Sequence, residues 1–220
     1  MLETRDKSAL KAWLERGVAS GLLAELEEVT TDMWDAYTTA AREVLGSRIR
    51  IVIDRFHVIK HFHDCLGKAR LEIQRSLPKD AAAELKGSRW LWVTNPENLS
   101  PQDQKQLERL QHRFPELARL SEHREQLRQI FENRQIRTAA VGTIYLQKWV
   151  KQGRQLGLTA LEGFYKTLEN WMKKIANYFV SRSTNGRTEG INRNLRCLLW
   201  RACGMRNFNH FRLRVLHAFG

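Results

Sequence analysis

The chain has 220 residues, 42% of them hydrophobic and 28% charged, so it can bury a core and is not expected to be disordered. It contains neither the roughly 20-residue apolar run of a membrane-spanning helix nor a signal-peptide pattern, which predicts a cytoplasmic protein. Its charge is unusual, because 37 Lys and Arg residues oppose 24 Asp and Glu residues, a net charge of +13. A field of this sign favours polyanionic partners such as DNA.

The N-terminal part predicts a strand, a helix and a second strand. Apolar residues at helical spacing predict helices over residues 9–18 and 34–44. A short segment around 28–31 ends at Asp32, and the β-branched run 49–53, which is the strongest predicted strand, ends at Asp54. A right-handed parallel crossover would place both aspartates at one edge of a small sheet, where open α/β sheets bind ligands.

The middle of the chain is predicted to be helical. A long helix starts near Val58, and residues 78–180 continue as helices interrupted by prolines. A short extended piece over Trp90–Val93 is a further possibility. Apolar residues at alternating three- and four-residue steps between Leu158 and Phe179 predict a packed core face.

The last forty residues are arginine-rich. Residues 181–220 hold eight Arg and one Glu, with neither Lys nor Asp, a net charge of +7. After the turn-rich 181–186, a predicted helix carries two faces: Ile191, Leu195, Leu198 and Ala202 on one, and Glu189, Asn192, Arg193 and Arg196 on the other. Arg without Lys indicates bidentate phosphate or base contacts, although a solvated face explains any single Arg equally well.

Asp32 and Glu189 are candidate metal ligands. Phosphoryl transfer between DNA strands uses two divalent cations about 4 Å apart, and carboxylates suit hard ions such as Mg²⁺. The structural alternative is that Asp32 caps a helix and Glu189 pairs with an arginine. The scattered cysteines Cys65, Cys197 and Cys203 indicate reduced thiols.

Four ordered segments add a family-level indication: 31–37 (TDMWDAY), 51–58 (IVIDRFHV), 184–192 (TNGRTEGIN) and 204–208 (GMRNF). Together they resemble insertion-sequence transposases of the ISL3 type, over nearly the whole chain. That family is regarded as having a DDE triad of catalytic acids on an RNase H-like fold, with an all-helical insertion before the last acid. The resemblance implies that Asp32 is the second catalytic acid and Glu189 the third, with Asp54 as the rival second acid. It also implies Mg²⁺ or Mn²⁺ as the cofactor of the intact enzyme, without assigning one to these 220 residues.

The resemblance also implies the fold and the domains. We expect an α+β fold that is predominantly α-helical, with a truncated RNase H-like core that retains two parallel strands. Residues 1–64 would form the partial core, residues 65–180 the all-helical insertion, and residues 181–220 the C-terminal core helices. The first catalytic aspartate and the strands that begin this fold are missing from these 220 residues. An unpaired sheet edge would then be left, so we expect partial instability unless a partner covers it.

The same family resemblance also implies residues that support the site. Asp54 and His57 resemble an Asp/Cys-x-x-His signature of related transposases, and with Asn192 they would support the site. Asp54, His57 and His61 also share a helical face that could bind zinc, an alternative that lacks a fourth ligand. Expected DNA contacts are Arg55, Lys60, Arg187, Arg193, Arg196, Arg201 and Arg206.

The predicted function is DDE-type, cut-and-paste DNA cleavage and strand transfer, in a truncated form that is inactive alone because one acid is missing. Expected partners are transposon-end and target DNA and a second copy or an intact transposase, with no membrane. The alternative is a non-catalytic basic DNA-binding regulator, or an inhibitor that co-assembles with an intact transposase. An RNA-binding helical protein is a third possibility, without a recognisable RNA-binding signature.

Overall fold

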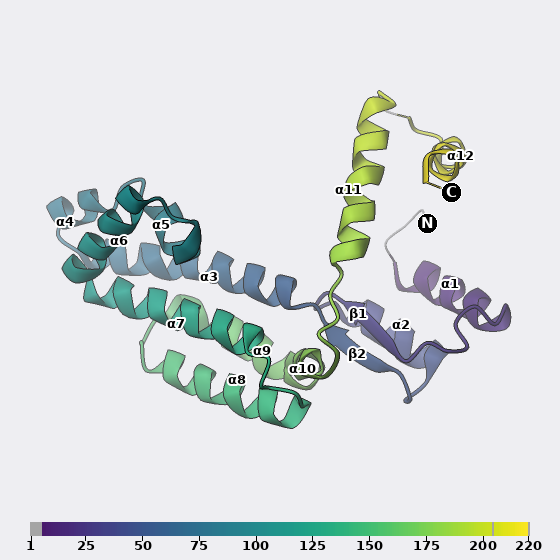
Figure 1. The fold of residues 1–220 in the computed structure, drawn as a ribbon, viewed down its shortest axis with the longest axis horizontal. Coiled ribbons are helices and arrows are strands. Elements are labelled where there is room, and N and C mark those ends of the chain that lie inside the picture. The colour runs from purple at the N-terminus through teal and green to yellow at the C-terminus, as the bar shows by residue number, and fades with distance from the viewer. Residues whose placement is uncertain (1–5, 204, 220) are drawn as a thin grey trace. The chain divides into compact units, whose positions relative to one another are not determined.

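A computed structural model describes residues 6–203 and 205–219. The chain divides into two compact units, one formed by residues 1–54 with 183–220 and the other by residues 55–182. We call the first the sheet unit and the second the helical unit (Figure 1). Within the described ranges, no helix is long and apolar enough to cross a membrane.

The sheet unit contains a two-stranded parallel sheet. Its elements are α1 (Lys7–Ala19), β1 (Glu28–Thr31), α2 (Asp35–Leu45), β2 (Arg50–Ile53), α11 (Gly186–Arg201) and α12 (Phe208–Phe219). Strands β1 and β2 pair in parallel, with Glu28 opposite Arg50 and Thr31 opposite Ile53. The predicted parallel pairing of two strands with a helix between them is confirmed, and with the many helices it confirms the α+β class.

Apolar residues on the first two helices and both strands form the core of the sheet unit. The buried members are Leu14, Ala41, Leu45, Ile49 and Ile51. Helix α2 ends where Gly46 adopts φ 79°, a left-handed conformation that glycine accepts more readily than any other residue. The three residues 51–53 of β2 are fully buried, which explains why that segment gave the strongest strand pattern.

The described residues of the helical unit form helices joined by turns, without a strand. They are α3 (Arg55–Ser76), α4 (Lys79–Glu84), α5 (Arg89–Val93), a 3₁₀ turn (Pro96–Asn98), α6 (Pro101–Arg113), α7 (Pro115–Glu132), α8 (Ala139–Arg154), α9 (Thr159–Ala176) and α10 (Tyr178–Ser181). Helix α9 packs between α3 and α8, and α7 contacts both α3 and α8 (Figure 1). The predicted core face of α9 is confirmed, because Leu161, Tyr165, Leu168 and Ile175 are buried.

The extended piece considered over Trp90–Val93 is wrong, because these residues lie in helix α5. Trp92 is buried, and its indole N–H donates to the Ser88 hydroxyl one turn earlier, at 3.2 Å. Burial against the helical unit and this i to i+4 bond outweigh the strand preference of the aromatic residues.

An aromatic cluster fills the centre of the helical unit. The His123 ring stacks on Trp149 with centroids 4.0 Å apart, and its Nε2 atom lies 3.0 Å from the Tyr165 hydroxyl. The Trp149 indole N–H donates to the His123 carbonyl at 2.9 Å. Phe62 and Phe164 each pack edge-on against Trp149, and their two rings are tilted against each other. These contacts tie α3, α7, α8 and α9 together.

Arg182 closes the helical unit at its C-terminal end. The residue has φ 60°, and its guanidinium donates to the carbonyls of Phe131, Asn133 and Ile136 at 2.6–2.7 Å. These carbonyls lie at the end of α7 and just beyond it, so one cation satisfies acceptors that a helix end leaves open.

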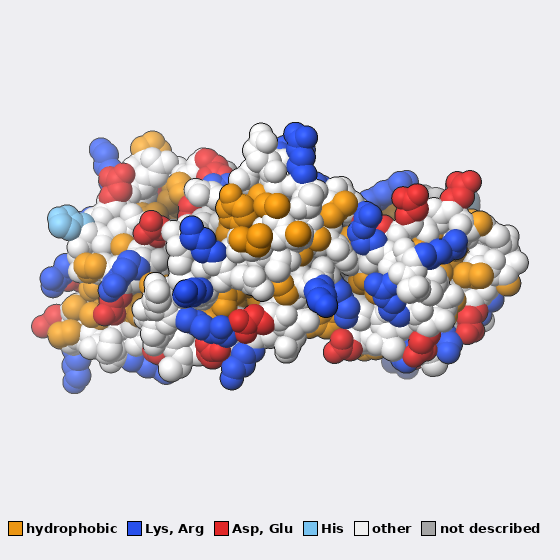
Figure 2. All heavy atoms as spheres, turned by 90° about the horizontal axis from the view of Figure 1, so that it is seen from below, with side chains coloured by type: hydrophobic (Ala, Val, Ile, Leu, Met, Phe, Trp, Pro, Cys, Tyr) orange, Lys and Arg blue, Asp and Glu red, His pale blue; other side chains and the backbone are white. Residues whose placement is uncertain are grey.

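Helix α8 leaves apolar side chains on the surface of this unit. Val141, Ile144 and Tyr145 are 40–63% exposed. Figure 2, which views the molecule from the side on which α8 lies, shows hydrophobic side chains gathered near the middle of this face among scattered Lys and Arg. The exposed face of α8 thus carries three apolar side chains beside polar and charged ones such as Lys148 and Lys151.

Candidate functional site

Asp32 and Asp54 lie at the same edge of the sheet, as predicted. Each follows the last residue of its strand, and these last residues, Thr31 and Ile53, face each other in the register. The Asp54 backbone N–H donates to the Thr31 carbonyl at 2.9 Å, and the Thr31 hydroxyl donates to the Asp32 carboxylate at 3.3 Å. The ladder thus holds the two aspartates side by side at the carboxyl end of both strands.

Asp54 connects this edge to the start of α11. Its side chain is 1% exposed, and its carboxylate accepts a hydrogen bond of 2.9 Å from the backbone N–H of Asn185. Asn185 is the residue that precedes helix α11. A carboxylate at the N-terminal end of a helix also meets the positive end of the helix dipole. Asp54 therefore fixes the beginning of α11 at the sheet edge.

Glu189 lies in the first turn of α11. Its backbone N–H donates to the Asn185 carbonyl at 2.8 Å, and its side chain is partly buried. At 1.5 Å of rise per residue, Glu189 is about 6 Å along the helix axis from Asn185. Asp32 and Asp54 thus share the sheet edge, and Asp54 is bonded to the residue that precedes the helix carrying Glu189.

Asp32 does not occupy a helix-capping position. Helix α2 begins at Asp35, its N-cap residue is Trp34, and the Asp32 carbonyl accepts from the Trp34 N–H at 2.8 Å. Asp32 is partly exposed at the sheet edge. The structural alternative for this carboxylate, a cap on the following helix, is therefore wrong.

The described residues contain no group of three or more His, Cys, Asp or Glu side chains that could hold a metal ion. Asp32, Asp54 and Glu189 therefore do not form a three-ligand set. The zinc alternative of Asp54, His57 and His61 is wrong for the same reason. His61 packs edge-on against Phe164 at 5.3 Å, and burial lowers its pKa.

His57 lies in the first turn of α3, in the helical unit, and is partly buried beside the Phe56 ring. Asn192 is exposed on α11, where its backbone carbonyl accepts from Arg196 Nε at 3.3 Å.

The predicted DNA-contacting residues fall into two groups. Five lie on or after α11 in the sheet unit and are exposed: Arg187, Arg193, Arg196, Arg201 and Arg206. The other two lie on α3, where Lys60 is exposed and Arg55 is partly buried over the Tyr178 ring at 5.8 Å. Of the segment 204–208, Gly204 lies outside the described residues.

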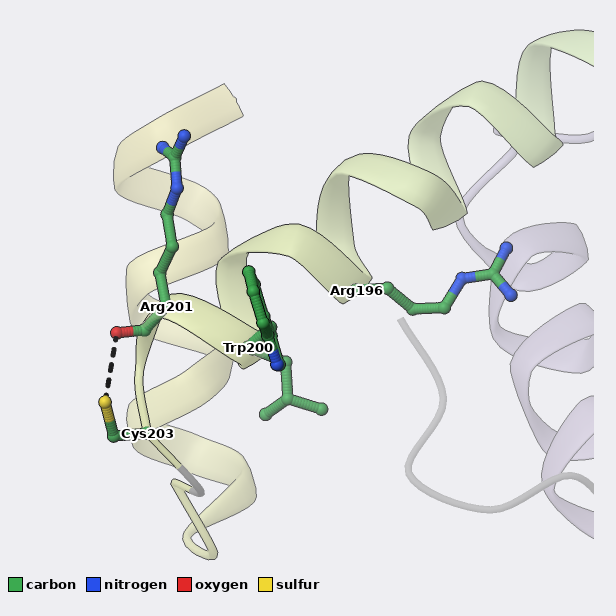
Figure 3. A pocket seen from close by; sticks show the side chains of 5 residues that line it. Arg196, Trp200, Arg201 and Cys203 are labelled. Carbon is green, nitrogen blue, oxygen red and sulfur yellow. Dashed lines mark hydrogen bonds between the residues drawn. The ribbon is translucent and has the colours of Figure 1, made fainter.

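A shallow pocket lies at the end of α11. Figure 3 shows Trp200 between Arg196 and Arg201, whose side chains extend in different directions, and Leu199 and Cys203 complete the lining. Trp200 is 86% exposed. Cys203 and Cys197 are free thiols on the surface, and Cys65 is a buried one, as predicted.

Asn185 and Trp200 are two further candidate residues that the sequence did not single out. Asn185 acts through its backbone N–H, which almost any residue type could supply. The only sequence signal at this position is the Asn-Gly turn. Trp200 had a detectable signal, because it follows Glu189 by eleven residues, which is about three helical turns.

The chain is similar to known transposases. A family model for transposases of the ISL3 type matches residues 1–215. The transposase for insertion sequence element IS1001 of Bordetella parapertussis is 26% identical over 218 residues, which cover 98% of this chain and 52% of that protein. The chain thus spans about half the length of the curated relative it matches. No solved structure matches significantly.

Proposed function

The chain belongs to the ISL3 family of transposases, and from this premise we propose that it carries two acids of a DDE-type site for DNA strand cleavage and transfer. Asp32 is the second acid and Glu189 the third, on an RNase H-like core that residues 65–180 interrupt as an all-helical insertion. Asp54, His57 and Asn192 support the site. The DNA partners are the ends of the element and its target.

The Asp54–Asn185 hydrogen bond is the observation that carries this proposal. It spans 131 positions of sequence and brings the start of α11 to the sheet edge at which Asp32 lies. This hydrogen bond is the structural ground for proposing that Asp32 and Glu189 belong to one site. The proposal assigns Asp54 a positioning role because its carboxylate is buried and already engaged by a backbone donor.

The donor chemistry of Asp32 and Glu189 fits a hard divalent cation such as Mg²⁺ or Mn²⁺, since both offer carboxylate oxygens. Such ions, when bound, activate the attacking oxygen and stabilise the leaving one. The protein's own part is to hold the two carboxylates on a strand end and a helix, and to orient DNA by its phosphates along the arginines of α11.

Two carboxylates do not complete a DDE site. We therefore propose that these 220 residues alone do not transfer DNA strands, and that a further carboxylate is required. The matched relative is about twice as long as this chain, and we propose that residues outside the matched part supply this carboxylate. Assembly with a second copy or with an intact transposase is part of the same proposal.

The alternative function is a non-catalytic DNA-binding regulator or inhibitor. The observation in its favour is that α11 and α12 carry most of the arginine-rich stretch, which offers cationic contacts to DNA phosphates without any catalytic group. Both functions predict DNA affinity that falls steeply with salt, so metal-dependent cleavage separates them.

The test is a cleavage assay with the complete transposase polypeptide, Mg²⁺ and DNA bearing the ends of the element. Asp32→Asn and Glu189→Gln should each abolish cleavage and leave DNA binding intact. Asp35→Asn is the matched control, because Asp35 is an exposed acid three residues away at the start of α2. Unchanged cleavage by the first two variants would remove these residues from the site.

Asp54→Asn decides between the two aspartates. A positioning role predicts partial loss of cleavage together with lower thermal stability, because the buried carboxylate accepts from Asn185. Complete loss with unchanged stability, combined with normal cleavage by Asp32→Asn, would make Asp54 the second acid.

A further inference from the structure

One stripe of α11 joins the candidate acid to an exposed tryptophan. Arg193, Arg196 and Trp200 follow Glu189 by four, seven and eleven residues. At about 100° per residue, these four side chains fall within a sector of about 60° around the helix. A ligand held at Glu189 and extending along this face would meet two arginines and then the indole.

The exposure of this stripe indicates that it is available to a ligand. Arg193 and Arg196 are exposed, and helix α11 has no buried residue in the described structure. Trp200 is 86% exposed, whereas Trp92 and Trp149 in the helical unit are buried. An indole this exposed removes little apolar area from water and adds little to folding.

The pocket beside Trp200 combines a mainly apolar lining with two cationic side chains, which suits a stacked base next to a phosphate. Two arginines, Arg196 and Arg201, line its pocket, and no acid does (Figure 3). Guanidinium groups bind phosphate, and an aromatic ring offers a stacking surface to any base. Bases inside a duplex are already stacked, so the indole would meet an unpaired one.

We propose that Trp200 stacks on an unpaired base of a DNA strand whose phosphates contact Arg193 and Arg196. This inference rests on the proposed function and adds a single-stranded segment next to the cleavage position as a part of the substrate. Glu189 and Trp200 are about 16 Å apart along the helix axis, at 1.5 Å per residue. At the duplex spacing of about 3.4 Å per nucleotide, the stacked base lies up to about five nucleotides from the phosphate at Glu189, and fewer where the unpaired strand is more extended.

The test compares two DNA probes bound to the 220-residue chain. One is a blunt fluorescent duplex, and the other is the same duplex with an eight-nucleotide single-stranded DNA tail containing 2-aminopurine, a base whose fluorescence falls when it stacks. Trp200→Ala should weaken binding of the tailed probe about tenfold or more and abolish the fluorescence change. Binding of the blunt duplex should change less than about twofold, since it depends on phosphate contacts.

Two further variants make the result specific. Trp200→Tyr should retain most of the affinity for the tailed probe, because a phenol ring still stacks. Trp90→Ala is the matched control, since Trp90 is another exposed tryptophan, 45% accessible, on α5 of the helical unit. It should leave the affinities for both probes unchanged.

Several outcomes would overturn the proposal. They are equal effects of Trp200→Ala on both probes, no effect on either, stronger competition by a single-stranded RNA tail, or conversion of a dimer to a monomer by Trp200→Ala in light scattering. The last would assign Trp200 to an interface between copies. A chain that binds neither probe would refute the proposed function as well, whereas normal duplex binding with an indifferent Trp200 refutes this inference alone.

Discussion

Helices α9 and α11 are alike in length, with 18 and 16 residues, and differ in what their side chains do. Seven residues of α9 are buried in the helical unit, whereas the structure buries none on α11. Packing holds α9 in place, whereas α11 is tied to the sheet edge by the hydrogen bond at its N-cap residue Asn185. The side chains of α9 maintain the fold, and those of α11 are left accessible to solvent.

The largest expected effect contrasts two tryptophans. Trp149 is 1% exposed and Trp200 is 86% exposed. Trp149→Ala should lower the free energy of unfolding by about 4 kcal/mol, because it leaves a cavity and removes the bond to the His123 carbonyl. Trp200→Ala should change it by less than about 0.5 kcal/mol. Urea unfolding measures both changes. Equal losses of unfolding free energy would contradict the view that the helical unit depends on buried side chains and α11 does not.

The pH dependence of stability should come from the helical unit. Burial lowers the pKa of His123 from 6.5 to about 4, so between these values the unfolded chain binds a proton that the folded chain resists. Stability is full above pH 6.5 and should fall by about 3 kcal/mol as the pH drops to 4. Denaturant unfolding across this range measures the slope.

The control for this prediction is His123→Phe, which removes the titrating group and keeps an aromatic ring. Its slope between pH 6.5 and 4 should be flatter than that of the parent chain. An identical slope would show that the pH dependence of stability comes from other groups. Among them are His61 and His63, whose pKa values burial also lowers.

A smaller effect tests how tightly α8 packs in the helical unit. A Cβ atom on Gly142 would collide with the Phe179 ring, which is itself buried. Gly142→Ala should therefore cost about 2 kcal/mol of unfolding free energy. Gly163→Ala on α9, where a Cβ meets nothing within 4 Å, should instead stabilise by about 0.5 kcal/mol. If Gly142→Ala also stabilises, the packing of α8 is looser than described.

The smallest expected change in stability concerns α11 itself. Arg193→Ala combined with Arg196→Ala should alter unfolding by less than about 0.5 kcal/mol. The same variant should reduce the slope of log affinity for duplex DNA against log salt by about 2, one unit for each lost phosphate contact. Lys105→Ala with Arg109→Ala, exposed residues on α6, is the control and should leave the slope unchanged. An unchanged slope for the α11 variant would contradict its assigned role.

The sequence predicts the sheet edge well because its signals are local. The β-branched run before Asp54 and the helix between the strands suffice to place Asp32 and Asp54 together, and register pairing confirms it. The prediction of an extended piece over Trp90–Val93 was wrong, because the hydrogen bond from Trp92 to Ser88 and the burial of the helix outweigh the local strand preference of these residues. The contact of Asn185 with Asp54 was beyond prediction, since it joins positions 131 apart through a backbone N–H.

The hydrogen bond between Asp54 and Asn185 also describes how the chain is routed. The chain leaves the sheet unit after Asp54, passes through the helical unit and re-enters at Ser183, so exit and return lie next to each other. A detour with adjoining ends can change in length at little thermodynamic cost, since each doubling of a flexible loop adds only about 0.6 kcal/mol of closure entropy. Because its two ends adjoin, a change in the length of the helical unit need not alter the path of the chain within the sheet unit.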